Sequence, residues 1–124
     1  MKKIIVAITT IILVTLTTSS FAMQASWYSV QSLKNEGTYK YSKGVMANGT
    51  LFVDDNLTCA TRLYPLGTIL RITNLDTKRS VEVKVTDRIG KRFTYKRIDL
   101  SKGAFSKIAD CKQGLVQVLV ERVE

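Results

Sequence analysis

The fold of this 124-residue chain is decided by residues 80–105, SVEVKVTDRIGKRFTYKRIDLSKGAF. Valine occupies every second position from 81 to 85, and this period of two is typical of a half-buried strand. Asp87 follows where that strand enters a loop that contains a glycine and several basic residues. Asp99 stands in a second strand-like run, RIDL. Two carboxylates beside strand-like runs, among cations, indicate a candidate site.

The flanking segments extend the β pattern. Residues 68–75 (TILRITNL) alternate in the same way and join residues 80–86 through a short polar turn, which predicts a β-hairpin. Residues 115–123 (LVQVLVERV) are almost continuously apolar and predict a central final strand, and residues 25–29 (ASWYS) predict the first strand. Residues 34–49 are polar and contain glycine, which predicts a mobile loop.

One short helix is expected between the last two strands. Ser101 can cap it, and its apolar face would consist of Ala104, Phe105, Ile108 and Ala109. Many short strands with so little helix, in about a hundred residues, favour a small mainly β barrel over a layered α/β domain.

Residues 1–22 have the features of a secretory signal peptide. Two lysines precede a run from Ile4 to Leu16 that is apolar apart from threonines, and Ser20-Phe21-Ala22 supplies the small-x-small cleavage pattern. Cleavage after Ala22 would leave one domain, residues 23–124. The apolar run is shorter than the roughly 20 residues that span a bilayer, although an uncleaved N-terminal anchor is the alternative. The first cysteine is Cys59, so no lipid attachment, and no stable membrane anchor after cleavage, is expected.

Composition narrows the chemistry. The formal net charge of +9 becomes +7 once Lys2 and Lys3 leave with the signal peptide, which favours anionic partners. Basic residues with interleaved aromatics on a nucleic-acid fold are not recognisable, so no nucleic-acid partner is expected. The chain has no histidine, so acid–base chemistry must use carboxylates, tyrosines, lysines or cysteines. No metal and no cofactor is implied, because no residue cluster has the required spacing.

The two cysteines of an exported chain are expected to form one disulfide, Cys59 to Cys111. Closing a loop of this length would stabilise the domain by about 4 kcal/mol in the chain-entropy treatment. A nucleophilic or metal-binding thiol is the weaker alternative, because there is no histidine to support it.

The order of short motifs resembles a known family. ASWYS, MANGT, LTCATRLYPLGTILRITNL, VEVKVTDR, RIDLSKGAFSKIA and LVQVLVERV follow one another as in the barrel domain of the rare lipoprotein A (RlpA) family, and the C-terminal half also resembles expansin barrels. The resemblance implies a six-stranded double-psi β-barrel with one or two short helices. It also implies lytic transglycosylation of peptidoglycan, in which the muramic sugar's own hydroxyl attacks the anomeric carbon. One acid/base residue can then suffice, unlike the two carboxylates of ordinary glycosidases.

The resemblance assigns roles to the two aspartates. The acid of the family's DRG motif falls on Asp87, which is predicted to be the acid/base, and the acid of its DLS motif falls on Asp99, which is predicted to be a second catalytic acid or a structural member of the site. The structural alternatives are that Asp87 pairs with Arg88 and that Asp99 stabilises the start of the following helix.

Other family positions differ here. Thr50 replaces a glutamate and Thr61 replaces a histidine, and Ile89 and Gly90 replace the glycine and proline that follow the DR pair. Asp54 or Asp55 is a candidate replacement for the missing carboxylate. The basic residues around Arg92 are expected to hold an anionic glycan. The predicted substrate contacts are Trp27, Tyr28, Asn48, Thr50, Thr61, Arg88 and Arg97.

Three functions follow, in order of preference. The first is an exported, monomeric protein of the secreted or periplasmic space that cleaves peptidoglycan strands. The second is a non-catalytic, expansin-like module that binds or loosens the wall, which the threonines at positions 50 and 61 favour. The third is a secreted interaction protein on the same scaffold.

Overall fold

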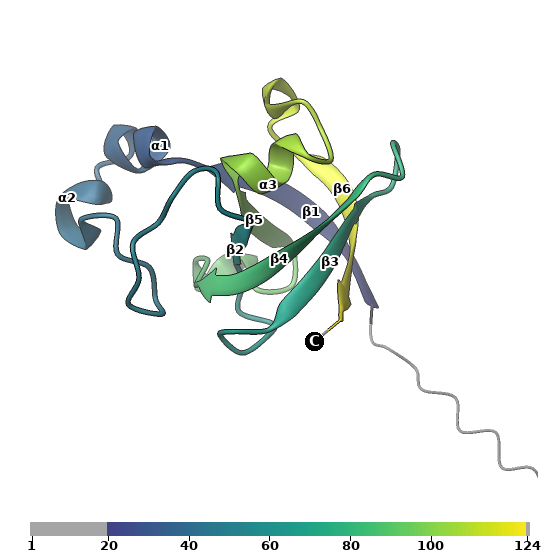
Figure 1. Ribbon diagram of the computed structural model, residues 1–124, viewed down its shortest axis with the longest axis horizontal. Helices are drawn as coiled ribbons and strands as arrows, with labels where there is room; N and C mark the ends of the chain where they lie inside the picture. Colours follow the sequence, from purple (N-terminus) through teal and green to yellow (C-terminus); the bar gives the residue numbers. More distant parts are fainter. Residues whose placement is uncertain (1–19, 124) are drawn as a thin grey trace, which may run out of the picture.

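The computed structural model describes residues 20–123, which form a closed barrel of six strands (Figure 1). Around the barrel the strands run β1, β5, β2, β4, β3, β6, and β6 closes against β1. The pairs β1–β5 and β2–β4 are parallel, and the other neighbouring pairs are antiparallel. The predicted six-stranded, mainly β barrel is therefore confirmed. The strand bounds are Ser20–Tyr28 (β1), Thr58–Ala60 (β2), Ile69–Asn74 (β3), Ser80–Asp87 (β4), Arg97–Ser101 (β5) and Val116–Arg122 (β6).

The predicted hairpin and the predicted helix are both present. β3 and β4 pair antiparallel from Ile69 opposite Lys84 to Thr73 opposite Ser80. The helix α3 spans Lys102–Ser106, and the Ser101 hydroxyl accepts a hydrogen bond from the Ala104 amide at 3.1 Å. This bond satisfies one of the free amides at the start of the helix, as the sequence predicts.

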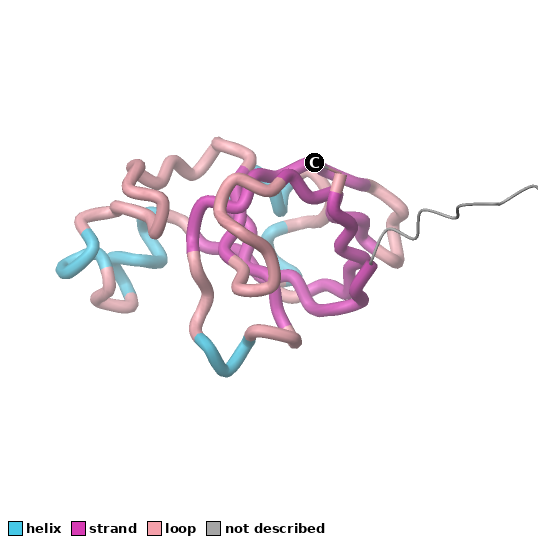
Figure 2. The backbone as a smooth tube through the Cα atoms, turned by 90° about the horizontal axis from the view of Figure 1, so that it is seen from below, coloured by secondary structure: helices cyan, strands magenta, loops and turns pink. Residues whose placement is uncertain are grey.

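Three short α-helices occur among the described residues, where one or two are expected from the sequence. Besides α3 these are α1 (Val30–Asn35) and α2 (Tyr39–Ser42), which occupy the segment predicted to be a loop and lie to one side of the barrel (Figures 1 and 2). Ser29 leaves the strand and caps α1 through a reciprocal pair of bonds with Ser32, at 2.7 and 3.1 Å. Two single-turn 3₁₀ helices complete the chain, η1 at Lys91–Phe93 and η2 at Cys111–Gln113.

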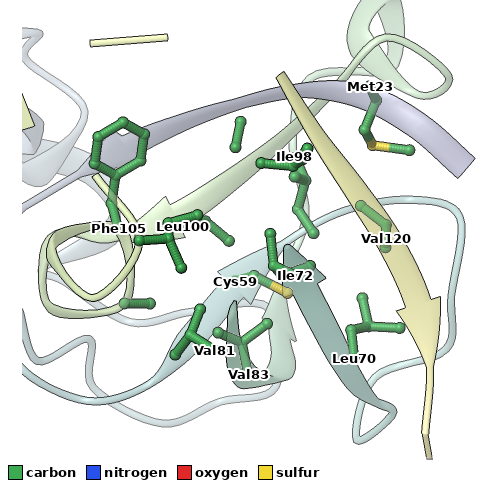
Figure 3. Packing of buried hydrophobic residues seen from close by; sticks show 14 of the residues in the cluster. Met23, Cys59, Leu70, Ile72, Val81, Val83, Ile98, Leu100, Phe105 and Val120 are labelled. Carbon is green, nitrogen blue, oxygen red and sulfur yellow. The ribbon is translucent and has the colours of Figure 1, made fainter. Parts of the chain in front are cut away.

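The barrel interior is filled by apolar side chains from all six strands and from α3 (Figure 3). Alternate residues of β4 and β6 point inward, which gives each strand its period of two. Each fully buried leucine, isoleucine or valine contributes about 1.5–3 kcal/mol of transfer free energy. A second, smaller group, which we call the minor core, packs outside the barrel and consists of Tyr28, Met46, Phe52, Ala60 and Ile89. The minor core attaches the segment after α2 to the barrel.

β1 begins earlier than the sequence predicts. Residues 1–19 of the predicted signal peptide lie outside the described residues, but Ser20–Ala22 extend β1 and pair with Glu121, Val120 and Leu119 of β6. These three residues are exposed, and Met23 is the first buried residue of the strand. Cleavage after Ala22 would therefore shorten β1 without opening the core. Within residues 20–123, helices stay too short and too polar to cross a membrane.

The predicted disulfide between Cys59 and Cys111 is not formed in this structure, where both cysteines are free thiols. Cys59 lies on β2 with its side chain wholly inside the barrel, among Leu70, Ile72 and Val83 (Figure 3). Cys111 lies at the surface in η2, with its sulfur directed at the carbonyl of Lys102. Burial raises the pKa of both thiols. A single possible pairing in the sequence does not ensure that the fold brings the two sulfurs together.

Candidate active site

A cavity of about 620 Å³ lies where β1, β4 and β5 face the α1–α2 segment and η1. Both aspartates singled out from the sequence line it. Its charged lining residues comprise three acids and three arginines, namely Glu36, Asp87, Asp99, Arg88, Arg92 and Arg97. The lining is thus balanced in formal charge, although the whole chain is strongly basic.

Asp99 occupies the middle of β5, between Ser26 of β1 and Ala60 of β2. The Ser26 hydroxyl donates a hydrogen bond to its Oδ1 at 3.0 Å. Burial raises the pKa of Asp99 to about 6, and the negative charges of Glu36 and Asp87 act in the same direction. The Ser26 hydrogen bond and the positive charge of Arg97 oppose this rise. A carboxyl group with this pKa exchanges protons readily near neutral pH, as general acid–base catalysis requires.

Asp87 is the last residue of β4, and three donors point at its carboxylate. The backbone amides of Ala47 and Arg88 donate to Oδ1 at 3.0 and 2.9 Å. The Tyr28 hydroxyl donates to Oδ2 at 3.2 Å. Asp87 is therefore an acceptor on both oxygens, and it joins β1, β4 and the turn at residue 47 into one unit.

Tyr28 connects this unit to the minor core. Its ring stacks on Phe52, with centroids 4.3 Å apart. Burial, followed by the negative charge of Asp87, holds the pKa of Tyr28 well above its usual range, so its hydroxyl remains a donor. Phe52 covers one face of the Tyr28 ring, and the Tyr28 hydroxyl is the group that bonds to Asp87. Ser26 and Tyr28 share one face of β1, as residues two apart on a strand do.

Trp27 lies on the opposite face of β1 and touches the border of the cavity. Its indole donates to the carbonyl of Cys111 at 2.9 Å, and the Lys102 ammonium lies 5.6 Å from the ring centroid. The side chain of Trp27 also packs against the apolar side chains of the barrel interior. Stacking of Trp27 on a sugar remains a prediction, and the structure assigns this residue clear structural contacts.

The arginines divide into two groups. The Arg88 guanidinium donates to the carbonyls of Thr61 and Tyr64 at 2.7 and 2.8 Å, so it ties the end of β4 to the loop after β2. Arg92 and Arg97 instead lie over the ring of Phe93, with centroid distances of 4.6 and 4.7 Å. Arg92, Phe93 and Arg97 form a cationic wall of the cavity, which we call the arginine wall.

Three predicted contact residues do not line the cavity. Asn48 Oδ1 accepts bonds from the amide and the hydroxyl of Thr50 at 3.0 and 2.7 Å, and both residues are exposed in a turn. Thr61 is buried, and its hydroxyl accepts a bond from the Leu63 amide. Its own amide donates to the Asp87 carbonyl at 3.2 Å. The roles predicted for these residues as substrate contacts therefore have no support from their positions.

Neither acid proposed as a replacement at position 50 reaches the cavity lining. Asp54 Oδ1 accepts a hydrogen bond from the Val30 amide at 2.8 Å and so anchors α1. Several lining residues were not predicted from the sequence, among them Ser26 and Glu36. Ser26 could have been found from the period of two that places it beside Tyr28. Glu36 lies in the segment predicted to be a loop, and no pattern there distinguishes it.

A closed six-stranded barrel with two parallel strand pairs, β1–β5 and β2–β4, defines the protein as a double-psi β-barrel. Residues 20–120 match the lytic transglycolase family, and the chain belongs to it. This confirms the resemblance found in the sequence.

Relatives and solved structures agree with this placement. The chain is 36% identical over 100 residues to the endolytic peptidoglycan transglycosylase RlpA of Pseudomonas aeruginosa, covering 81% of this chain and 26% of the relative. The RlpA of Campylobacter jejuni is 41% identical over 75 residues, covering 60% and 27%. The chain thus spans about a quarter of the length of these RlpA relatives.

Two solved structures share the fold. The Streptomyces papain inhibitor superimposes with a TM-score of 0.65 at 20% identity, covering 86% of this chain and 96% of its own. An expansin from Clavibacter michiganensis in complex with cellohexaose has a TM-score of 0.63 at 19% identity, covering 86% and 51%. At such identities the likeness concerns the fold alone.

Proposed function

We propose that this protein is an exported enzyme of the cell envelope that cleaves the glycan strands of peptidoglycan by lytic transglycosylation. The observation that carries the proposal is Asp99, a half-buried carboxyl group in the cavity wall with its pKa raised to about 6. Relatives named as endolytic peptidoglycan transglycosylases support the substrate class. The signal-like residues 1–22 support export.

Asp99 performs both proton transfers in this mechanism. In its protonated form it donates to the glycosidic oxygen as the bond from that oxygen to the anomeric carbon breaks. The C6 hydroxyl of the muramic sugar forms the new bond to the anomeric carbon, and its proton passes to the Asp99 carboxylate. The acid is regenerated, and no second carboxylate is needed to activate water.

Asp87 has a different role in this proposal from the acid/base role that its motif predicts. Three donors hold its carboxylate as an acceptor, whereas Asp99 has one. Asp87 orients Tyr28 and the turn at Ala47, and its charge helps to raise the pKa of Asp99. Variants of the two aspartates separate these roles.

The arginine wall, Arg92, Phe93 and Arg97, provides the substrate contacts. Guanidinium groups bind carboxylates with two parallel hydrogen bonds and stack on aromatic rings. A glycan that bears a carboxylate, as muramic acid does, fits a wall of this kind beside the proton donor.

The test uses purified protein and peptidoglycan strands stripped of stem peptides, with 1,6-anhydro-muramic ends measured by mass spectrometry. We expect the unaltered protein to produce these ends. We expect Asp99→Asn to produce none while it still pellets with sacculi, and Asp87→Asn to retain part of the activity. Equal activity of Asp99→Asn and the unaltered protein would overturn the assignment of the acid.

A non-catalytic, expansin-like binding module is the second candidate function. It is favoured by Thr50 and Thr61, which replace a glutamate and a histidine of the resembled family and lie outside the cavity lining. Sacculus binding without any anhydro ends would establish it. Absence of both would leave a secreted interaction protein.

A further inference from the structure

Glu36 is a third acid of the cavity, and the mechanism above does not use it. It ends α1 at the C-cap position, where its amide donates to the Ser32 carbonyl at 2.9 Å. Its side chain is exposed to solvent and lines the cavity together with Asp99 and the arginine wall. The carboxylate thus belongs to the α1–α2 side of the cavity, whereas Asp99 belongs to the barrel side.

The position of Glu36 is fixed by contacts between α1 and the barrel. The Ser29–Ser32 capping box sets the start of the helix directly after β1. The Val30 amide is bound by Asp54, whose own carbonyl accepts a bond from the Gly103 amide at 2.8 Å. Leu33, one turn before Glu36, packs against the minor core. The six residues of α1 are therefore held at both ends, and Glu36 faces the cavity as a consequence.

Several charged or titratable groups act on Asp99 or are acted on by it. They come from β1, β2, β4, β5 and the end of α1, and they are Tyr28, Cys59, Asp87, Arg97 and Glu36. Glu36 and Asp87 are the acids of this group, and Glu36 contributes more than Asp87 to the raised pKa of Asp99. Arg97 opposes both.

We propose that Glu36 is a positioning residue of the enzyme, whose negative charge across the cavity favours the protonated form of Asp99 that donates to the substrate. This inference rests on the proposed function and adds a residue from outside the barrel to it. A general acid is effective only in its protonated form, so a carboxylate that opposes its ionisation extends activity to higher pH.

The experiment compares Glu36→Gln and Glu36→Asp with the unaltered protein, and Asp76→Asn in the β3–β4 turn serves as the matched control. The pH dependence of kcat/KM is measured on peptide-free glycan strands. For Glu36→Gln we expect the falling, alkaline limb to move to lower pH by about half a unit, which is about threefold in rate on that limb. Glu36→Asp keeps the negative charge, so its alkaline limb should lie close to that of the unaltered protein. Asp76→Asn should leave the limb unchanged.

Salt supplies a second readout that a merely structural role would not move. Because the side chain is exposed, roughly 1 M salt should screen its charge and bring the unaltered protein's alkaline limb towards that of Glu36→Gln. An alkaline limb of Glu36→Gln that coincides with that of the active, unaltered protein would overturn the inference. A displacement of the limb that is independent of salt would overturn it as well.

Failure of the proposed function is distinguishable from failure of this inference. The NMR signal of the Asp99 carboxyl carbon reports its titration without any turnover. If the unaltered protein makes no anhydro ends but Glu36→Gln lowers the Asp99 titration midpoint, the proposed function fails and the electrostatic link stands. If the midpoint does not change, the link itself is wrong.

Discussion

Replacing Asp99 with asparagine should make the folded protein more stable at neutral pH. Asparagine has the same shape, and its Oδ1 can still accept the hydrogen bond from Ser26. It carries no charge, so it removes the free energy needed to ionise a partly buried carboxyl group in the cavity wall. Groups held in place for catalysis commonly lower stability in this way, as we expect of the proposed proton donor.

The magnitude follows from the pKa of Asp99. Its ordinary value is 3.8, which we take for the unfolded chain, and burial raises it to about 6 in the folded protein. Well below pH 3.8 both states hold the proton, and this group does not disfavour the folded state. As the pH rises from about 4 to about 6, the unfolded chain ionises while the folded state still holds the proton, so stability falls until the folded state ionises as well. The full difference corresponds to about 3 kcal/mol above this range.

Urea unfolding at several pH values between about 4 and 7.5 measures this effect directly. The free energy of unfolding of Asp99→Asn, minus that of the unaltered protein, should rise by about 2 kcal/mol across the range. Asp76→Asn, an exposed change in the β3–β4 turn, should show no such rise. A difference that is flat with pH, or that falls, would refute the reasoning about the burial of Asp99.

Three further predictions concern the surroundings of the site. Tyr28→Phe removes the hydroxyl that donates to Asp87, and we expect the free energy of unfolding to fall by about 1 kcal/mol, with a lower kcat in the anhydro-end assay. Gly103→Ala would place a Cβ 2.8 Å from the carbonyl oxygen of Asp54, so the free energy of unfolding in urea should fall by about 1–3 kcal/mol. The control Gly90→Ala, whose Cβ would lie 3.7 Å from its nearest neighbour, should be tolerated. Thiol titration of denatured, unreduced protein should detect both cysteines, and detection of neither would restore the disulfide.

The longer barrel strands were predictable because buried and exposed residues alternate along them with a period of two. β4 and β6 bury alternate side chains, and this alternation is visible in the sequence. The three residues of β2, all buried, are too few for any period to be recognised. α1 and α2 have no buried residues, so they lack an apolar stripe, and α1 depends on its cap at Ser29 and on Asp54.

The sequence points to two acids that line the cavity, but it does not reveal their surroundings. Motif order identifies Asp87 and Asp99, yet it cannot show that three donors occupy one carboxylate while burial raises the pKa of the other. Thr61 illustrates the same limit, because a residue at a position of interest can lie behind the site rather than in it. Glu36 becomes visible only when α1 is placed against the barrel.

The place of β1 between β5 and β6 also determines when the site can form during synthesis and folding. Ser26 meets its carboxylate partner 73 positions along the chain, and Tyr28 meets its partner 59 positions along. Both contacts, and the closure of the barrel by β6, need the C-terminal part of the chain to be already synthesised. Such distant pairings make folding slow, since the connecting chain must be ordered before any contact rewards it. A chain that extends past Asp99 but lacks β6 therefore carries all three acids of the cavity before the barrel that arranges them has closed.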